Sequence, residues 1–260
     1  MRFTKTIAIT LAAAALAFVT ACGGGKDDAN GDVKPTSVAA SAAPSGKDVL
    51  GTAVKDLGTT TYTYTMKIAQ GVVAGAVDPA GKQQAKLDGA ASGIKFSIEG
   101  IVLGADYYFK TSIPAAGVNT KKWYKLDRTK VTKDEIVGLF ESRDPTGSQE
   151  LVARIGTATQ DNPTTISGTY DLTKGGDLGV DDSAALTALG DKAKAAPFVA
   201  TLDQQRHLTS IKITIPAYGT TAEELISVDY AAHGQPVAIA APKSADVTTA
   251  TTAVYTLLNN

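Results

Sequence analysis

Hydrophobic and polar positions follow a helical period near residue 50 and then change to strict alternation. Between Ser45 and Gly58, apolar residues recur at helical spacing, with Ser45 placed to cap the first turn and Gly58 to end the last. Over residues 61–68, "TYTYTMKI", every second side chain is large and aromatic or aliphatic. Such alternation is typical of a strand with one buried face. The pattern predicts a helix over 45–58, followed directly by a half-buried strand.

The alternation continues through most of the remaining chain, in segments separated by glycine, aspartate and proline. We expect strands, some of them paired around a turn, at 71–78, 83–90, 94–104, 106–113, 121–127, 164–174, 197–216 and 224–242. Helices are expected at 132–140, where Thr132 and Glu135 form a capping-box pattern, at 146–156 and at 181–194. The last fifteen residues fit a strand, a helix or a loop. Because sequential strands usually pair as neighbours, the fold class predicted is α+β with an antiparallel sheet.

The first 46 residues follow a different pattern. Arg2 and Lys5 precede an apolar run of fifteen residues, Ile7 to Ala21, which ends at the single cysteine, Cys22. This run is shorter than the ~20 residues of a membrane-spanning helix and has the size of a secretory signal. A tract rich in Gly, Ser, Ala and Pro then leads to the first predicted helix. We therefore expect a signal peptide at 1–21, a lipidated cysteine with a flexible tether at 22–46, and one domain at 47–260.

The four residues "VTAC", Val19 to Cys22, resemble the bacterial lipobox. In that motif the cysteine sulfur takes a diacylglycerol, cleavage makes the cysteine the new N-terminus, and the acyl chains anchor the protein. Cys22 is accordingly the predicted lipidation site, membrane lipids are its predicted partners, and the outer face of the cytoplasmic membrane is the predicted location. The alternative is an ordinary signal that leaves Cys22 as a free thiol. A disulfide within the chain is excluded, because there is no second cysteine.

Composition and motif content speak against several functional classes. The chain has 25 basic and 26 acidic side chains, and losing residues 1–21 would remove two bases and no acid. A nucleic-acid partner is therefore not expected. The two histidines, His207 and His233, are expected to be isolated residues in turns, and no G-x-S-x-G motif is present. We expect no catalytic residues, no metal, no cofactor and a monomer.

Several segments together resemble actinobacterial lipoproteins of the LppX/LprG family, which are related in fold to the LolA and LolB carriers. The resemblance rests on the lipobox and on the first helix followed by "YTYTMKI". It also rests on "GADYYFK…KKWYKLD", on the turn in "PFVATLDQQRHLTSIKI" and on "VDYAAHGQPVAIAAP", and it covers roughly residues 45–245. It implies a curled antiparallel sheet, an incomplete or half β-barrel, with a few helices packed on its concave face.

The resemblance also implies an apolar cavity that accepts acyl chains, and alternation nominates the side chains that would line it. The candidates are Tyr62, Tyr64, Met66, Ile94, Phe96, Ile98, Tyr107, Phe109, Tyr170, Ile211, Ile213 and Ile215. The alternative for each residue is a place in an ordinary packed core.

A second candidate surface comes from the segment "KKWYKLD". Lys121, Lys122, Trp123 and Lys125 combine an amphipathic aromatic side chain with basic neighbours, which suits a rim facing anionic head groups. A solvated strand edge protected by lysines is the alternative.

The function predicted is a membrane-anchored lipoprotein that binds acyl chains of lipids or glycolipids and carries them across the cell envelope. Two alternatives remain at this stage. One is a non-catalytic scaffold or sensor that acts through protein contacts. The other is a receptor for a small non-lipid solute, which would need convergent polar groups in its pocket.

Overall fold

The computed structural model describes residues 44–69, 71–91, 93–133, 136–141, 144–174 and 183–259. They belong to one compact unit, Ala43–Asn260. The predicted signal peptide, Cys22 and the predicted tether up to residue 43 lie outside the described residues. Among the helices of the described part, none is long and apolar enough to cross a membrane.

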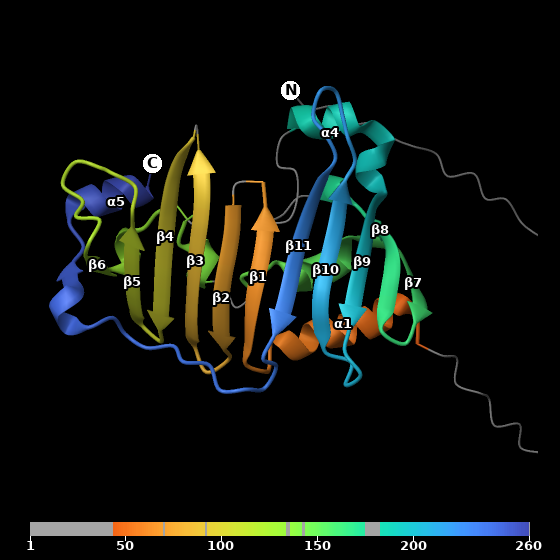
Figure 1. The fold of residues 1–260 in the computed structure, drawn as a ribbon, viewed down its shortest axis with the longest axis horizontal. Helices are drawn as coiled ribbons and strands as arrows, with labels where there is room; N and C mark the ends of the chain where they lie inside the picture. The colour runs from red at the N-terminus through yellow and green to blue at the C-terminus, as the bar shows by residue number, and fades with distance from the viewer. Residues whose placement is uncertain are drawn as a thin grey trace, which may run out of the picture. The chain divides into compact units, whose positions relative to one another are not determined.

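The strands of the described part form one open, twelve-stranded sheet (Figure 1), in the order β12-β6-β5-β4-β3-β2-β1-β11-β10-β9-β8-β7. Neighbouring strands are antiparallel except β12, which runs parallel to β6. The α+β class with an open, mostly antiparallel sheet is confirmed. The strands are β1 Tyr62–Ile68, β2 Gly71–Asp78, β3 Lys82–Ala91, β4 Ile94–Leu103, β5 Asp106–Thr111, β6 Trp123–Leu126, β7 Ile155–Asn162, β8 Thr165–Tyr170, β9 Ala196–Leu202, β10 Leu208–Ile215, β11 Glu224–Ala231 and β12 Val247–Thr249.

Short helices accompany the sheet. They are α1 Gly46–Leu57, α2 Gly138–Glu141, α3 Ser148–Arg154, α4 Ser183–Leu189 and α5 Thr252–Leu258, with 3-10 turns at Arg128–Lys130, Leu172–Lys174, Gly190–Lys194 and Ser244–Asp246. Helix α1 passes behind β7–β10 in Figure 1 and packs against β7, β8 and β10. Helix α2 lies against β3 and β4.

Helix α1 forms where its sequence predicts it. The Ser45 hydroxyl accepts a hydrogen bond from the Asp48 backbone N–H at 3.2 Å, and the Asp48 carboxylate accepts one from the Ser45 backbone N–H at 3.2 Å. This reciprocal pair is a capping box. The apolar stripe of the helix is buried, and Gly58 follows as the C-cap. The helix is therefore fixed at both ends by local contacts and held by burial of one face.

Cross-strand register divides the side chains of the sheet between two faces. One row of partners runs from Tyr64 through Gly75, Ala85 and Gly100 to Phe109. The residues of this face pack with the apolar sides of the helices in the main core. We call it the helix-covered face. Following the register across the whole sheet, all twelve side chains nominated as cavity lining lie on it.

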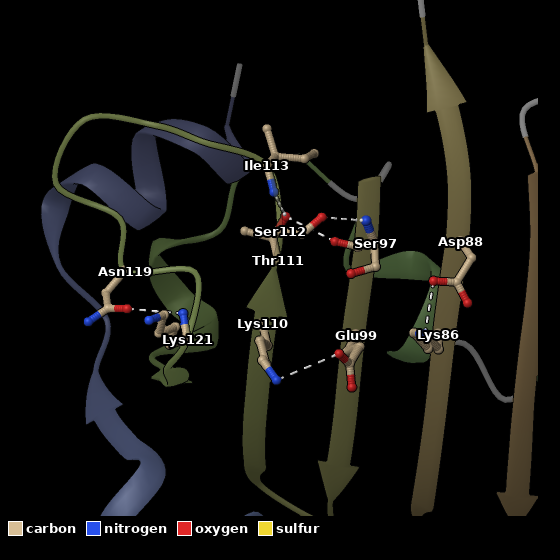
Figure 2. Close-up of polar contacts among 10 residues, drawn as sticks. All are labelled: Lys86, Asp88, Ser97, Glu99, Lys110, Thr111, Ser112, Ile113, Asn119 and Lys121. Atoms are coloured by element: carbon tan, nitrogen blue, oxygen red, sulfur yellow. Dashed lines mark hydrogen bonds and ion pairs between the residues drawn. The ribbon is translucent and has the colours of Figure 1, made fainter. Parts of the chain in front are cut away.

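The opposite face of β3–β5 carries charged side chains (Figure 2). Lys86 and Asp88 form an ion pair at 2.9 Å on β3, and Lys110 of β5 reaches Glu99 of β4 at 3.9 Å. Pairs exposed in this way contribute only about 0–1 kcal/mol each. They mark this face as the solvated side of the sheet and add little to its stability.

Three segments differ from the sequence expectations. The helix expected from Thr132 is described only from Gly138; Asp134 and Glu135 lie outside the described residues, and the Thr132 N–H donates to Asn259 Oδ1 at 2.8 Å. Strand β7 was not predicted, because "IGTATQDN" is polar at most positions of both faces. The segment at 236–242 is an extended loop, and not a strand, that crosses the charged face in Figure 1 and buries Ile239 there.

Candidate functional site

A second row of register partners forms the floor of a pocket on the helix-covered face. Val77 of β2 pairs with Gln83 of β3, Gln83 pairs with Val102 of β4, and Val102 pairs with Tyr107 of β5. Alternate side chains of a strand share one face. These four therefore project together, beside the row that contains Gly75 and Gly100.

The pocket above this floor has a volume of about 330 Å³. Leu57 and Gly58, at the end of α1, form one wall, and Glu141 of α2 forms another. The remaining lining comes from the turns that join β2 to β3 and β4 to β5, at Asp78, Pro79, Gly81 and Gly104. The site is thus built where two hairpin turns meet the ends of two helices.

One polar group on the floor has no partner. The Gln83 side chain is only 6% exposed, and its Oε1 is buried without a hydrogen-bond partner. A buried polar group left unpaired is unfavourable, and in native structures such groups are rare. Gln83 thus lines the pocket with a side chain whose buried oxygen is unpaired.

The other polar groups of the pocket are already engaged. The Tyr107 hydroxyl donates to Glu141 Oε1 at 3.2 Å, and Arg128 Nε donates to Glu141 Oε2 at 2.6 Å. Burial is the main cause that raises the pKa of Tyr107, and the neighbouring Glu141 carboxylate raises it further. The Asp78 carboxylate accepts from the Ala80 backbone N–H at 2.9 Å. These contacts fix α2 and the β2–β3 turn at the mouth of the pocket.

Beside the pocket, the Phe140 and Tyr64 rings pack over Gly100 and Gly75. A Cβ added to Gly100 would lie 2.0 Å from Phe140 Cγ, and one added to Gly75 would lie 2.5 Å from the Tyr64 ring. Phe140 comes from α2 and is buried. The Phe140 and Tyr64 rings therefore occupy the space that larger residues at Gly75 and Gly100 would take.

Buried tyrosines continue this packing toward β11. The ring centroids of Tyr62 and Tyr64 are 6.3 Å apart, and those of Tyr62 and Tyr230 are 5.9 Å apart. The Tyr230 hydroxyl bonds to Thr146 at 2.9 Å and to Ser148, whereas the Tyr64 hydroxyl is buried without a partner. Burial raises the pKa of all three tyrosines, so they are neutral at physiological pH.

A second cavity lies at the other end of β2–β4, where it is lined by residues of both faces of the sheet. This cavity has a volume of about 490 Å³ and is lined by Gly71, Gly89, Lys95 and Phe96, among others. Ile94, at the start of β4, is 68% exposed. Apolar side chains of the helix-covered face thus meet solvent at the strand ends opposite the Gln83 pocket.

Most of the nominated lining residues are packed core. Of the twelve, Tyr107 lines the Gln83 pocket and Phe96 the opposite cavity. Met66, Ile98, Phe109, Tyr170, Ile211, Ile213, Ile215, Tyr62 and Tyr64 are buried in the main hydrophobic cluster.

Of the residues that line the pocket, the sequence nominates only Tyr107; those it misses include Leu57, Val77, Gln83, Val102 and Glu141. Alternation with Ala85 and Leu87 could have placed Gln83 on the inward face. A glutamine, however, does not fit the apolar lining that the alternation predicts.

The candidate rim residues lie away from this pocket. Trp123 lies on the charged face, with Lys110 Nζ 5.7 Å from its ring centroid. Lys122 Nζ donates to the Ala245 carbonyl at 2.7 Å, and Lys125 pairs with Asp106 at 2.7 Å. The backbone N–H of Lys121 donates to Asn119 Oδ1 at 3.0 Å (Figure 2).

The expectation that the two histidines are isolated was wrong. The rings of His207 and His233 stack with centroids 5.1 Å apart, and His207 Nδ1 lies 2.9 Å from Asp203 Oδ2. His233 Nε2 lies 2.8 Å from the Leu208 carbonyl, to which it donates. Within the described residues, no group of three or more His, Cys, Asp or Glu side chains could hold a metal ion.

No protein-family model and no curated protein matches the sequence. Among solved structures, the chain is similar to a LolA superfamily protein from Nitrosomonas europaea, with 8% sequence identity and a TM-score of 0.23. The match covers 75% of this chain and 96% of that chain. The finer likeness to actinobacterial lipoproteins stays a prediction. At this identity and TM-score, function has to be argued from the residues of the pocket.

Proposed function

We propose that this chain is a non-catalytic, membrane-anchored lipoprotein that binds an acyl chain on the helix-covered face of β2–β5 and carries it across the cell envelope. In this proposal Cys22 bears the lipid anchor and the segment before α1 serves as the tether. The acyl chain enters through the Gln83 pocket. The protein acts by shielding apolar surface from water and needs no reacting group.

The observation that carries the proposal is the pocket itself. Its lining is mixed: Leu57, Val77 and Val102 contribute apolar side chains, beside the polar side chains of Asp78, Gln83, Tyr107 and Glu141. Apolar side chains bind the body of a small ligand, and convergent polar groups fix its orientation. Burial of each methylene of a chain contributes ~0.8 kcal/mol, so even a short buried segment contributes substantially to affinity.

The short helix over this part of the sheet also favours a ligand with an extended chain. Helix α2, which lies against β3 and β4, is only four residues long, whereas α1 has twelve residues. The Phe140 ring lies against Gly100. Methylenes of a ligand could take the place of the ring there without leaving a void.

Two valines of β2 provide a matched test. Val77 lines the pocket, and Val72, five residues earlier, is 39% exposed on the opposite face. We expect Val77→Phe to fill the pocket and weaken binding of monolauroylglycerol at least tenfold, a change of ~1.4 kcal/mol. Val72→Phe should leave binding unchanged. Binding is measured by isothermal titration calorimetry below the critical micelle concentration, on the full chain carrying Cys22→Ser.

Overpacking can cost ~1–3 kcal/mol of stability, so circular dichroism must first show that both variants remain folded. If the unsubstituted chain binds no acyl ligand, the proposal fails.

The second candidate, a scaffold or sensor that acts through protein contacts, is favoured by the tight contact between Phe140 and Gly100. That contact shows a largely packed core beside the pocket. A scaffold would bind no acyl ligand, and Val77→Phe would then change stability alone. The titration above separates the two candidates.

A further inference from the structure

We infer that the Gln83 pocket selects an uncharged head group that bears hydroxyls and disfavours a phosphate. The inference rests on the proposed function, because it concerns the polar end of the bound lipid. It follows from three features of the pocket: the unpaired amide, the sign of the charges around it and the orientation of α1.

The unpaired amide lies at the centre of the floor. Gln83 is flanked by Val77 on one side and Val102 on the other, both apolar. Its Oε1 needs a hydrogen-bond donor, and its amide group can itself donate. A hydroxyl donates and accepts at once, so a hydroxyl of a ligand can supply the donor that Oε1 lacks. A phosphate at neutral pH offers chiefly acceptors and would leave Oε1 unpaired.

The charged side chains around the amide are acidic. Asp78 and Glu141 line the pocket, and no lysine, arginine or histidine is among the described residues that line it. Arg128, which contacts the Glu141 carboxylate, donates to Glu141 Oε2 at 2.6 Å and to the Val131 carbonyl at 2.9 Å. Its charge is thus already directed at a carboxylate and a carbonyl. An anionic head group would meet two carboxylates without a basic partner in the lining.

The orientation of α1 adds to this bias. The pocket wall contains Leu57 and Gly58, at the C-terminal end of the helix. Peptide dipoles sum so that this end of a helix carries partial negative charge. Lys55, in the last turn, is exposed and is not part of the lining. The helix end therefore repels an anion and favours a group that can donate hydrogen bonds.

Two ligands that share one chain test the selectivity. Monolauroylglycerol and 1-lauroyl lysophosphatidate differ in the phosphate, and both are titrated into the full chain carrying Cys22→Ser. We expect the glycerol lipid to bind roughly tenfold more tightly, which is the scale of one satisfied buried hydrogen bond together with avoided charge repulsion. Equal affinities, or tighter binding of the phosphate, would overturn the inference while leaving the proposed function standing. Absence of binding by both lipids would instead remove the proposed function.

Adjacent glutamines on β3 provide the matched variants. Gln83 faces the pocket, whereas Gln84 faces the opposite side, where it pairs with Ala76 and Ile101. We expect Gln83→Leu to lose most of the preference for the glycerol lipid and Gln84→Leu to keep it. Glu141→Gln should strengthen lysophosphatidate binding by several-fold. An identical preference in Gln83→Leu and Gln84→Leu contradicts the role of Gln83. Tighter binding of lauroyl choline, a cationic ester with the same chain, than of the glycerol lipid would overturn the preference for an uncharged head group, because charge alone would then set the affinity.

Discussion

Replacing Gly100 by alanine tests whether the Phe140 ring needs a bare backbone beneath it. An added methyl carbon would lie 2.0 Å from two carbons of the ring, Cγ and Cδ1. Carbon atoms in contact are about 3.5–4.0 Å apart. The backbone of β4 is held by β3 and β5 on either side, so the ring and its helix have to move.

The size of the effect follows from the burial of the ring. Phe140 is 1% exposed, and complete loss of its burial would cost about 1.5–3 kcal/mol. Alanine regains about 0.5–1 kcal/mol over glycine inside a strand. We therefore expect Gly100→Ala to lower the free energy of unfolding by about 2 kcal/mol. Phe140→Ala alone should lower it by about 3–5 kcal/mol, because it leaves a cavity in the core.

The double variant distinguishes a direct contact between Gly100 and Phe140 from two independent effects on stability. Once the ring is gone, the new methyl group no longer clashes and fills part of the cavity. The double variant should thus be at least about 2 kcal/mol more stable than the sum of the single effects predicts. Urea unfolding gives the three free energies, compared at equal m-values. Gly138→Ala is the control, because a Cβ there meets open space.

Additive effects of Gly100→Ala and Phe140→Ala would refute the reasoning. They would mean that the ring does not rest on Gly100 in solution. The proposal that a ligand can displace the Phe140 ring from β3 and β4 would then lose its structural basis.

Three further outcomes follow from individual contacts. Burial lowers the pKa of His233 below the ordinary value for histidine, about 6.5, so the unfolded state binds the proton more tightly. Stability should therefore fall as pH drops below about 6.5, and His233→Gln should flatten that slope in urea titrations. Ser45→Ala removes the cap of α1 and should cost about 0.5–2 kcal/mol in urea unfolding. Gln83→Leu without ligand should raise the free energy of unfolding by about 1 kcal/mol, because an unpaired buried oxygen is removed; a loss of stability would show that the amide is paired in solution.

Sequence patterns predict those elements whose capping residues or alternation lie within a few neighbouring positions. The capping residues around α1 and the alternation in β1 lie within a few positions of one another, and both elements have close to their predicted bounds. The same period of two placed all twelve nominated side chains on one face. Strand β7 was missed, because it pairs on one side only and needs little apolar surface.

The candidate site could not be predicted, because it depends on register between distant segments. Alternation shows that Gln83 points inward but does not show that it lies between Val77 and Val102, or that α1 ends above it. Likewise, the stacking of His207 and His233 depends on the pairing of β10 with β11. Contacts of this kind come from the assembled sheet and are not visible in the spacing of residues.

The most direct test of acyl-chain binding is to map where a bound chain touches the protein. A monoacylglycerol with a photoactivatable diazirine on the chain carbons next to its ester group is added to membranes that contain the full chain. The sample is irradiated, and the labelled residues are located by mass spectrometry. We predict labels on residues of the helix-covered face near the pocket, such as Val77 and Val102. Excess unlabelled lipid should remove these labels. Labels confined to the charged face, at residues such as Val72, or labels that do not saturate, would contradict it.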